Sequence, residues 1–419
     1  MDKQPTIRAV SNRADTLQNV ILEAFTCVQS DTVSGKLAQF SLRDWRRLGT
    51  WLDASGLALY FLEEMCSRGL VRVLPRTVLA TLQQNQADNR DRTDALMQEF
   101  MRLNVAFQAE KFDYLNVKGF TLGREYCSKP ALRSQFDLDF WLREGQAARC
   151  VPLMETMGYK VCGRTATTLE FRAGESHYPT LSEFYKPRIQ RAVEIHLRPA
   201  EQMARIVRQN GVLGGQVFPA LSREQIFILH SVHLAKHIRS EWTRASWMLE
   251  LRNAIQNAYA DSDFWDSVRE QSTAGGSAMS IGIAVLAVSR VFRLEIPSAL
   301  GSWSVEPLPK GVVRWLYENV ERCATAQFPG TKLYLLLERE LAKDDQEYKR
   351  RRHVAVLPLR LPGLITASRA GRRSSIRYIG MRIAFHVREN FRLMRAERDW
   401  ANRVDAPHAS VLHGGGGIT

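Results

Sequence analysis

Two aspartates stand one residue apart in RSQFDLDFWL, residues 133–142, which otherwise has the apolar composition of a buried strand. Side chains alternate along a strand, so Asp137 and Asp139 project to one side, about 7 Å apart. Such carboxylates repel each other unless a cation lies between them. Mg²⁺ binds one or two carboxylates together with phosphate oxygens, and paired ions serve in-line phosphoryl or nucleotidyl transfer. The spacing therefore indicates a metal-assisted transfer site.

The same pattern has a purely structural interpretation. Phe136, Leu138 and Phe140 would line the opposite face, so the aspartates could belong to a solvated strand face. They could also form ion pairs with Arg133 and Arg143.

A third acidic residue interrupts another apolar strand. Glu194 lies between Val193 and Ile195 in AVEIHLRP, and His196 shares its face. A third acid usually completes a cage of this kind, so we expect Glu194 to converge with the two aspartates. Glu170, in TTLEF, is the reserve candidate.

These residues need a small sheet to position them. The periodicity predicts helices over most of residues 17–114, a short strand at 115–117, and a turn at Gly119 into a helix that ends near Cys127. The aspartate strand, a helix and three more strands follow, and the chain is helical again after Pro219. We expect an N-terminal helical region (1–95), an α/β core (96–205), a C-terminal helical domain (206–345), an Arg-rich helical segment (346–404) and a disordered tail (405–419).

The net charge of +14 is concentrated in one segment. Residues 349–403 contain fifteen Lys or Arg against three acidic residues. Such a block indicates contact with a polyanion, namely nucleic acid, an anionic membrane surface or an acidic partner, or else a solvated helical face.

Other classes of protein are disfavoured. The six cysteines are scattered without a CxxC, which argues against a disulfide framework or a zinc site and fits a reducing compartment. The N-terminus lacks the apolar stretch of a secretory signal. The most apolar run, residues 278–292, is shorter than the ~20 residues of a membrane span. We therefore expect a cytoplasmic protein.

The sequence resembles the uncharacterised nucleotidyltransferase-like proteins of the DNA polymerase beta superfamily. Their LKG stretch, helix and R…DxD motif correspond to NVKGFTLGREYCSKPALRSQFDLDFWL, and their later acid–apolar–His strand end corresponds to VEIHLRP. A His-rich helix, LSREQIFILHSVHLAKHI, and RASWMLELRNAI follow in the same order. The resemblance covers roughly residues 40–320. It implies an α+β fold, with a small mixed-sheet nucleotidyltransferase core between helical regions.

The resemblance also implies roles. Asp137, Asp139 and Glu194 would be the catalytic, metal-binding carboxylates, with Mg²⁺ as the expected ion and Mn²⁺ as the alternative. Glu194 could also help to deprotonate the acceptor. Lys118, Gly119 and Arg133 would bind the nucleotide, although Lys118 could equally be a solvated lysine at a strand end.

One further group of residues received no catalytic role. His230, His233 and His237 share a helix face, but residues i and i+7 lie ~10 Å apart, too far for one tetrahedral ion. We expect this face, with Glu250 nearby, to pack against the core.

Two functions follow. The first is an enzyme that moves a nucleoside monophosphate from an NTP, with ATP the expected donor, to an unidentified hydroxyl or amine on a small molecule, RNA or protein. The second is a catalytically degenerate protein of this fold that binds RNA or an anionic surface through its basic segment, because the Gly-Ser that usually precedes the aspartates is absent. For an enzyme, we expect Asp139→Asn to abolish transfer and to leave the metal-free fold as stable or more stable.

Overall fold

The computed structural model describes residues 17–26, 30–174, 183–187, 191–356 and 372–404. It divides the chain into two compact units. The first comprises Met1–Ala235 and Arg244–Pro307, and the second comprises Lys236–Thr243 and Leu308–Thr419.

The first unit begins with helices. Ser41 and Asp44 form a reciprocal capping box that starts the third helix, and Gly56 ends it in the left-handed conformation, with φ of 74°. The fifth helix is the longest and leads into the sheet. The helices are α1 (Leu17–Ala24), α2 (Ser30–Ala38), α3 (Leu42–Ser55), α4 (Ala58–Ser67) and α5 (Arg76–Ala109).

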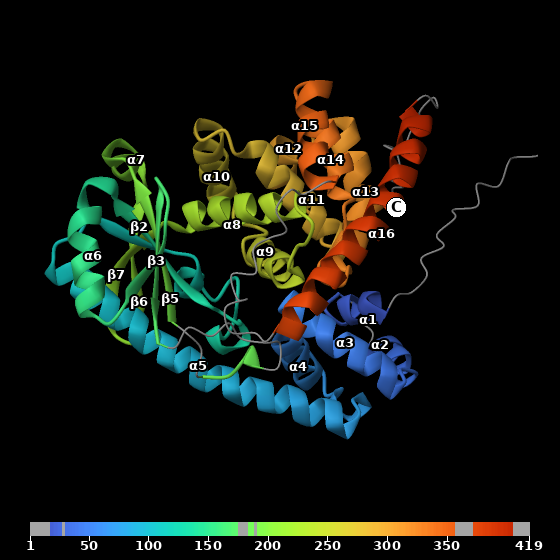
Figure 1. The fold of residues 1–419 in the computed structure, drawn as a ribbon, viewed down its shortest axis with the longest axis horizontal. Coiled ribbons are helices and arrows are strands. Elements are labelled where there is room, and N and C mark those ends of the chain that lie inside the picture. Colours follow the sequence, from blue (N-terminus) through green and yellow to red (C-terminus); the bar gives the residue numbers. More distant parts are fainter. Residues whose placement is uncertain (1–16, 27–29, 175–182, 188–190, 357–371, 405–419) are drawn as a thin grey trace, which may run out of the picture. The chain divides into compact units, whose positions relative to one another are not determined.

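A seven-stranded mixed sheet follows, in the order β3-β4-β5-β2-β1-β7-β6 (Figure 1). The pairs β2–β5 and β1–β7 are parallel, and the other neighbours are antiparallel. The expected α+β fold is confirmed. The strands are β1 (Tyr114–Val117), β2 (Asp137–Arg143), β3 (Lys160–Arg164), β4 (Thr168–Ala173), β5 (Arg191–Arg198), β6 (Arg208–Leu213) and β7 (Gln216–Leu221).

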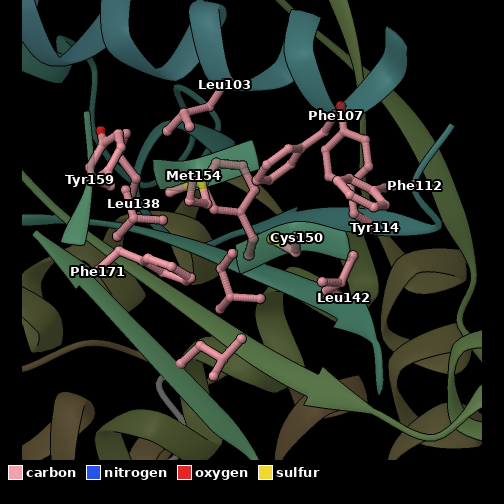
Figure 2. Packing of buried hydrophobic residues seen from close by; sticks show 14 of the residues in the cluster. Leu103, Phe107, Phe112, Tyr114, Leu138, Leu142, Cys150, Met154, Tyr159 and Phe171 are labelled. Atoms are coloured by element: carbon pink, nitrogen blue, oxygen red, sulfur yellow. The ribbon is translucent and has the colours of Figure 1, made fainter. Parts of the chain in front are cut away.

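One face of this sheet forms the hydrophobic core. Helices α5 and α6 (Ala147–Thr156) cover it. Figure 2 shows Leu103 and Phe107 of α5 and Met154 of α6 among the sheet residues Leu138 and Phe171. Because side chains alternate along each strand, filling this face with apolar residues turns the polar residues of β2 and β5 to the other face.

Of the remaining helices of the first unit, α7 lies between β5 and β6, and the others follow the sheet. They are α7 (Ala200–Arg205), α8 (Arg223–Ile238), α9 (Ala245–Asn257), α10 (Ser262–Ala274), α11 (Ala278–Phe292) and α12 (Ser298–Ser304). The last three residues of α8 fall in the second unit.

In the described residues of the second unit, loops connect helices. Its helices are α13 (Lys310–Ala324), α14 (Tyr334–Leu341), α15 (Asp345–Val356) and α16 (Arg372–Val404). The Arg-rich segment is therefore helical, as expected, where it is described. The tail expected at 405–419 lies outside the described residues. In the described part of the chain, every helix is too short or too polar to cross a bilayer.

Two expectations about local structure were wrong. Only a short 3₁₀ helix, Gly119–Thr121, follows Gly119, where a helix to Cys127 was expected. Glycines at both ends of GFTLG weaken helix formation, and a turn closes instead between Gly123 and Tyr126.

The second concerns residues 208–221, for which no strands were expected. They form the β6–β7 hairpin, with Gly214 and Gly215 at φ of 56° and 81°. A two-residue turn of this hand needs positive φ at both positions, so the Gly-Gly pair was the signal available in the sequence.

Candidate active site

An acidic row crosses the open face of the sheet. In the parallel β2–β5 pair, Asp139 lies opposite Glu194, and in the antiparallel β4–β5 pair Glu170 lies opposite Glu194. The alternate residues Leu138 and Phe140 are buried in the core on the other face. Phe136 was expected to line the same face as these two residues, but it does not. It precedes the strand, and the centroid of its ring lies 4.4 Å from that of Phe184.

Asp139 is the centre of this site. Its Oδ1 lies 2.7 Å from Lys118 Nζ and 3.1 Å from His196 Nε2. His196 Nε2 in turn lies 3.7 Å from Glu194 Oε2. Asp139, Glu194 and His196 each offer a ligand atom, and these atoms lie within 4.8 Å of one another.

Asp137 lies beside this cluster on the same face of β2, and it is not one of its three members. His196 was expected to share the face of Glu194 but not to take part in the site. The alternation of Glu194 and His196 on one strand was the signal that could have included it.

The two aspartates differ in electrostatic environment. Burial, followed by the charges of Asp139 and Glu194, raises the pKa of Asp137 from its ordinary value near 3.8 to about 6. Burial also opposes the charge of Asp139, but hydrogen bonds from His196 and Lys118 outweigh it and hold the pKa of Asp139 below its ordinary value. Burial and the charge of Asp139 raise the pKa of Glu194. The metal-free site therefore compensates one carboxylate and leaves the others under repulsion.

We predict that the stability of the metal-free protein falls as pH rises from 4 to 6 and that Asp137 contributes to this fall. Between these values the folded protein keeps the proton on Asp137 while the unfolded chain has released it, so raising the pH favours unfolding. The contribution amounts to about 2–3 kcal/mol once the pH exceeds the folded pKa.

The measurement is urea unfolding over this range in the presence of a chelator. Asp137→Asn should flatten the decline relative to the wild type, and Glu144→Gln on the exposed surface serves as control. An identical slope in the wild type and Asp137→Asn would show that Asp137 titrates normally.

The turn after β1 brings Lys118 to Asp139. Lys118 has φ of 59° and Gly119 has φ of 48°. Positive φ at a lysine is strained and costs about 1–3 kcal/mol, which the surrounding structure must offset. The positive φ favours glycine at position 119, and a Cβ there would also displace the end of the Gln135 side chain, whose Nε2 would lie 2.3 Å away.

A cavity of about 160 Å³ opens beside the aspartates. Asp137, Asp139 and Lys118 line it from the sheet, and His233, Arg244 and Trp247 line it from α8, the loop that follows and α9. The cavity is therefore lined by two carboxylates with Lys118 beside them, and by the further basic groups Arg133, His233 and Arg244.

Arg133, expected to bind nucleotide, lines this cavity but is held by an ion pair. Its Nε donates to Glu250 Oε1 at 2.9 Å, and the Tyr60 hydroxyl donates to the same oxygen at 2.9 Å. Glu250 is fully buried. The pair fastens the loop before β2 to helices α4 and α9. Of the ion pairs found among the described residues, none joins either aspartate to Arg133 or Arg143.

Arg244 is a cavity residue that the sequence analysis missed. It donates to Ser134 Oγ at 2.9 Å, and its Nε is buried without a hydrogen-bond partner. Within the described part of the chain no carboxylate lies within ion-pair distance of it. A Cβ at Gly56 would lie 2.7 Å from its Nη2, so the left-handed end of α3 leaves room for this guanidinium. Burial, together with the charge of Arg133, lowers the pKa of Arg244.

The histidine face of α8, where it belongs to the first unit, packs mainly against α9, and the ring of His230 also lies 5.4 Å from that of Tyr126. His230 is buried, and its Nε2 lies 3.0 Å from the carbonyl oxygen of Trp247. His233 contacts the Trp247 ring at 4.7 Å and lines the cavity. His237 falls in the second unit.

Residues 41–293, more than half of the chain, match the model of a family described as uncharacterised nucleotidyltransferases. The chain belongs to this family. The expected resemblance is therefore confirmed over most of the range 40–320. The family indicates a transferase, with an NTP as substrate.

Two solved structures show a weak similarity. One is the solution structure of the antibiotic-resistance factor ANT(2'')-Ia, with 11% identity and a TM-score of 0.32, covering 44% of this chain and 96% of that chain. The other is an antigenic nucleotidyltransferase-like protein from Paracoccidioides brasiliensis, with 10% identity and a TM-score of 0.31, covering 50% of this chain and 96% of that chain. Neither score supports an argument about function. No curated protein matches the chain.

Proposed function

We propose that this nucleotidyltransferase-family protein transfers a nucleoside monophosphate from an NTP, with ATP as the expected donor, to a hydroxyl or amine acceptor, with release of pyrophosphate. The observation that carries the proposal is the lateral pairing of Asp139 with Glu194 beside a cavity bordered by Lys118 and Arg244. Carboxylates can hold divalent cations, and Lys118 and Arg244 can neutralise phosphates, so this lining suits a substrate that brings phosphates and divalent cations together.

The donor set fits a divalent cation. Asp139 and Glu194 supply carboxylate oxygens, which Mg²⁺ and Mn²⁺ prefer. His196 adds an imidazole nitrogen to the same cluster, and the carboxylate of Asp137 lies beside it. Burial first, and then repulsion between neighbouring carboxylates, raises the pKa values of Asp137 and Glu194, and a cation would relieve this repulsion. When bound, the ion would supply Lewis-acid polarisation of the phosphoryl oxygens and stabilise the charge on the leaving group.

The protein's own residues would do the rest. Lys118, already 2.7 Å from Asp139 Oδ1, would neutralise a phosphate oxygen at the edge of the acidic row. Arg244 would take a second anionic oxygen, because its charge has no carboxylate partner and its Nε no hydrogen-bond partner among the described residues. Glu194, whose pKa is raised, would accept the proton from the acceptor group. Arg133 would keep the loop in place through Glu250.

The test combines transfer with binding. Purified protein is incubated with each labelled NTP and Mg²⁺ or Mn²⁺, and label is sought on the protein, on RNA and on small molecules of a cell extract. We expect label from one NTP and its loss in Glu194→Gln. If the protein binds NTP but transfers no label with either Mg²⁺ or Mn²⁺, it is instead the catalytically degenerate binding protein.

A binding measurement tests whether Arg244 contacts the nucleotide. Arg244→Gln should weaken Mg²⁺–NTP binding about tenfold, as expected for one lost charge-assisted hydrogen bond, while Arg72→Gln on the exposed surface should not. Equal affinities in the two variants would remove Arg244 from the nucleotide site.

A further inference from the structure

Helix α16 has one face that is firmly packed within the second unit. Leu393 and Trp400 are buried, and Trp400 Nε1 donates to Glu340 Oε1 at 2.7 Å. Glu397 accepts from Arg352 at 2.6 Å. Asn390 accepts from the buried Lys332 at 2.6 Å. These contacts fix the rotation of the helix about its own axis, so the residues on its other side face the solvent.

That outward face is apolar. Ile383, Val387, Phe391 and Met394 have exposed fractions of 53%, 52%, 62% and 40%. Their spacing of four, four and three residues places them along one side of the helix, over a length of about 16 Å. We call these four residues the α16 stripe. A contiguous row of exposed large apolar side chains marks an interaction surface more often than isolated ones do.

Arginines border the α16 stripe. Arg388 and Arg392 are about half exposed and share Glu389, which is itself buried. Arg395 and Arg398 are exposed, and among the described residues neither forms an ion pair. Asp399 is the one exposed acid described on this part of the helix. The surface is therefore an apolar row with excess positive charge at its side.

The charges beside the α16 stripe indicate which kind of partner binds to it. A second copy would bring the same arginines face to face, and like charges at close range oppose association. RNA would use the arginines but leave the apolar row in water, since among the four residues of the stripe only Phe391 offers a ring to stack on. An anionic lipid surface satisfies both features, because apolar side chains enter the acyl boundary while arginines meet the phosphates.

We propose that the α16 stripe docks the protein on an anionic phospholipid membrane, with Arg395 and Arg398 at the headgroups. The stripe lies outside residues 41–293, so this surface is additional to the family's core. The proposal does not depend on catalysis, and either can fail without the other.

The experiment is co-sedimentation of the full chain with vesicles of phosphatidylcholine alone or mixed with phosphatidylglycerol. We expect binding to the mixed vesicles only, weakened by added salt. Arg395→Gln with Arg398→Gln should reduce binding about 25-fold, since each arginine near an anionic surface contributes roughly fivefold. Ile383→Ser with Val387→Ser and Phe391→Ser should reduce it at least tenfold.

The matched control is Val105→Ser with Met279→Ser, which removes exposed apolar side chains elsewhere and should leave vesicle binding unchanged. Melting curves should show each variant folded, since all the substituted residues are exposed. Loss of binding in the arginine variant but not in the serine variant would overturn the proposal in favour of plain electrostatic adsorption. A lipid-free dimer that the serine substitutions dissociate would also overturn it.

Discussion

Asp139→Asn is expected to abolish nucleotidyl transfer and, at the same time, to destabilise the metal-free protein. Asp139 Oδ1 is the shared partner of Lys118 and His196, so the substitution removes an oxygen from the acidic row and the counter-charge of Lys118. We expect the transfer rate to fall by about 100-fold or more, comparable with the loss of a charge-stabilising group. The free energy of unfolding should fall by about 1–3 kcal/mol, because the half-buried Lys118 loses its partner.

This stability prediction corrects the expectation drawn from the sequence. Repulsion between the aspartates alone suggested that neutralising Asp139 would leave the fold as stable or more stable. The contacts show that Asp137, and not Asp139, carries the uncompensated charge. The pKa of Asp137 is raised, whereas that of Asp139 is lowered. Asp137→Asn is therefore the matched control: it should also impair transfer but should stabilise the metal-free protein near pH 8.

The two variants should be compared by urea unfolding with chelator, then with Mg²⁺ and NTP. The wild type should gain stability from the ligands, and both variants should lose most of that gain. Equal shifts of the same sign in both metal-free variants would contradict the division of roles between the aspartates. A full ligand response in Asp139→Asn would contradict its place in the metal site.

Glu250→Ala is expected to produce the largest loss of stability among the variants considered, about 3–5 kcal/mol. Glu250 is fully buried and accepts from Arg133 and Tyr60, so its removal leaves a guanidinium without its counter-charge and a hydroxyl without its acceptor. Because the same pair holds the loop before β2, NTP binding should weaken as well. Urea unfolding and nucleotide titration of the purified variant measure the two effects.

A double variant separates the ion pair from simple packing. Glu250→Leu combined with Arg133→Met removes both charges and keeps most of the volume, so it should recover a large part of the stability lost in Glu250→Ala. Glu250→Gln should lie between, since an amide oxygen can still accept from Tyr60. If the double variant were less stable than Glu250→Ala, the cost would come from lost packing and the ion pair would contribute little.

Local pattern in the sequence determined the two strands that carry the acids. Alternation within FDLDF and VEIHL placed Asp137, Asp139 and Glu194 on single strand faces, because a pleated strand directs every second side chain to the same side. The motif order was also sufficient to identify the family and its α+β fold. The Arg-rich segment could be assigned as helical from composition and spacing.

Only the tertiary structure decided which residues meet. Strand alternation is a local property, but the partner of a strand and its register depend on distant segments, so the pairing of Asp139 with Glu194 could not be read from either strand alone. Arg133 and Glu250 are separated by 117 positions. The charge of a buried group is set by such contacts, and therefore the opposite pKa shifts of two neighbouring aspartates follow from packing rather than from their shared motif.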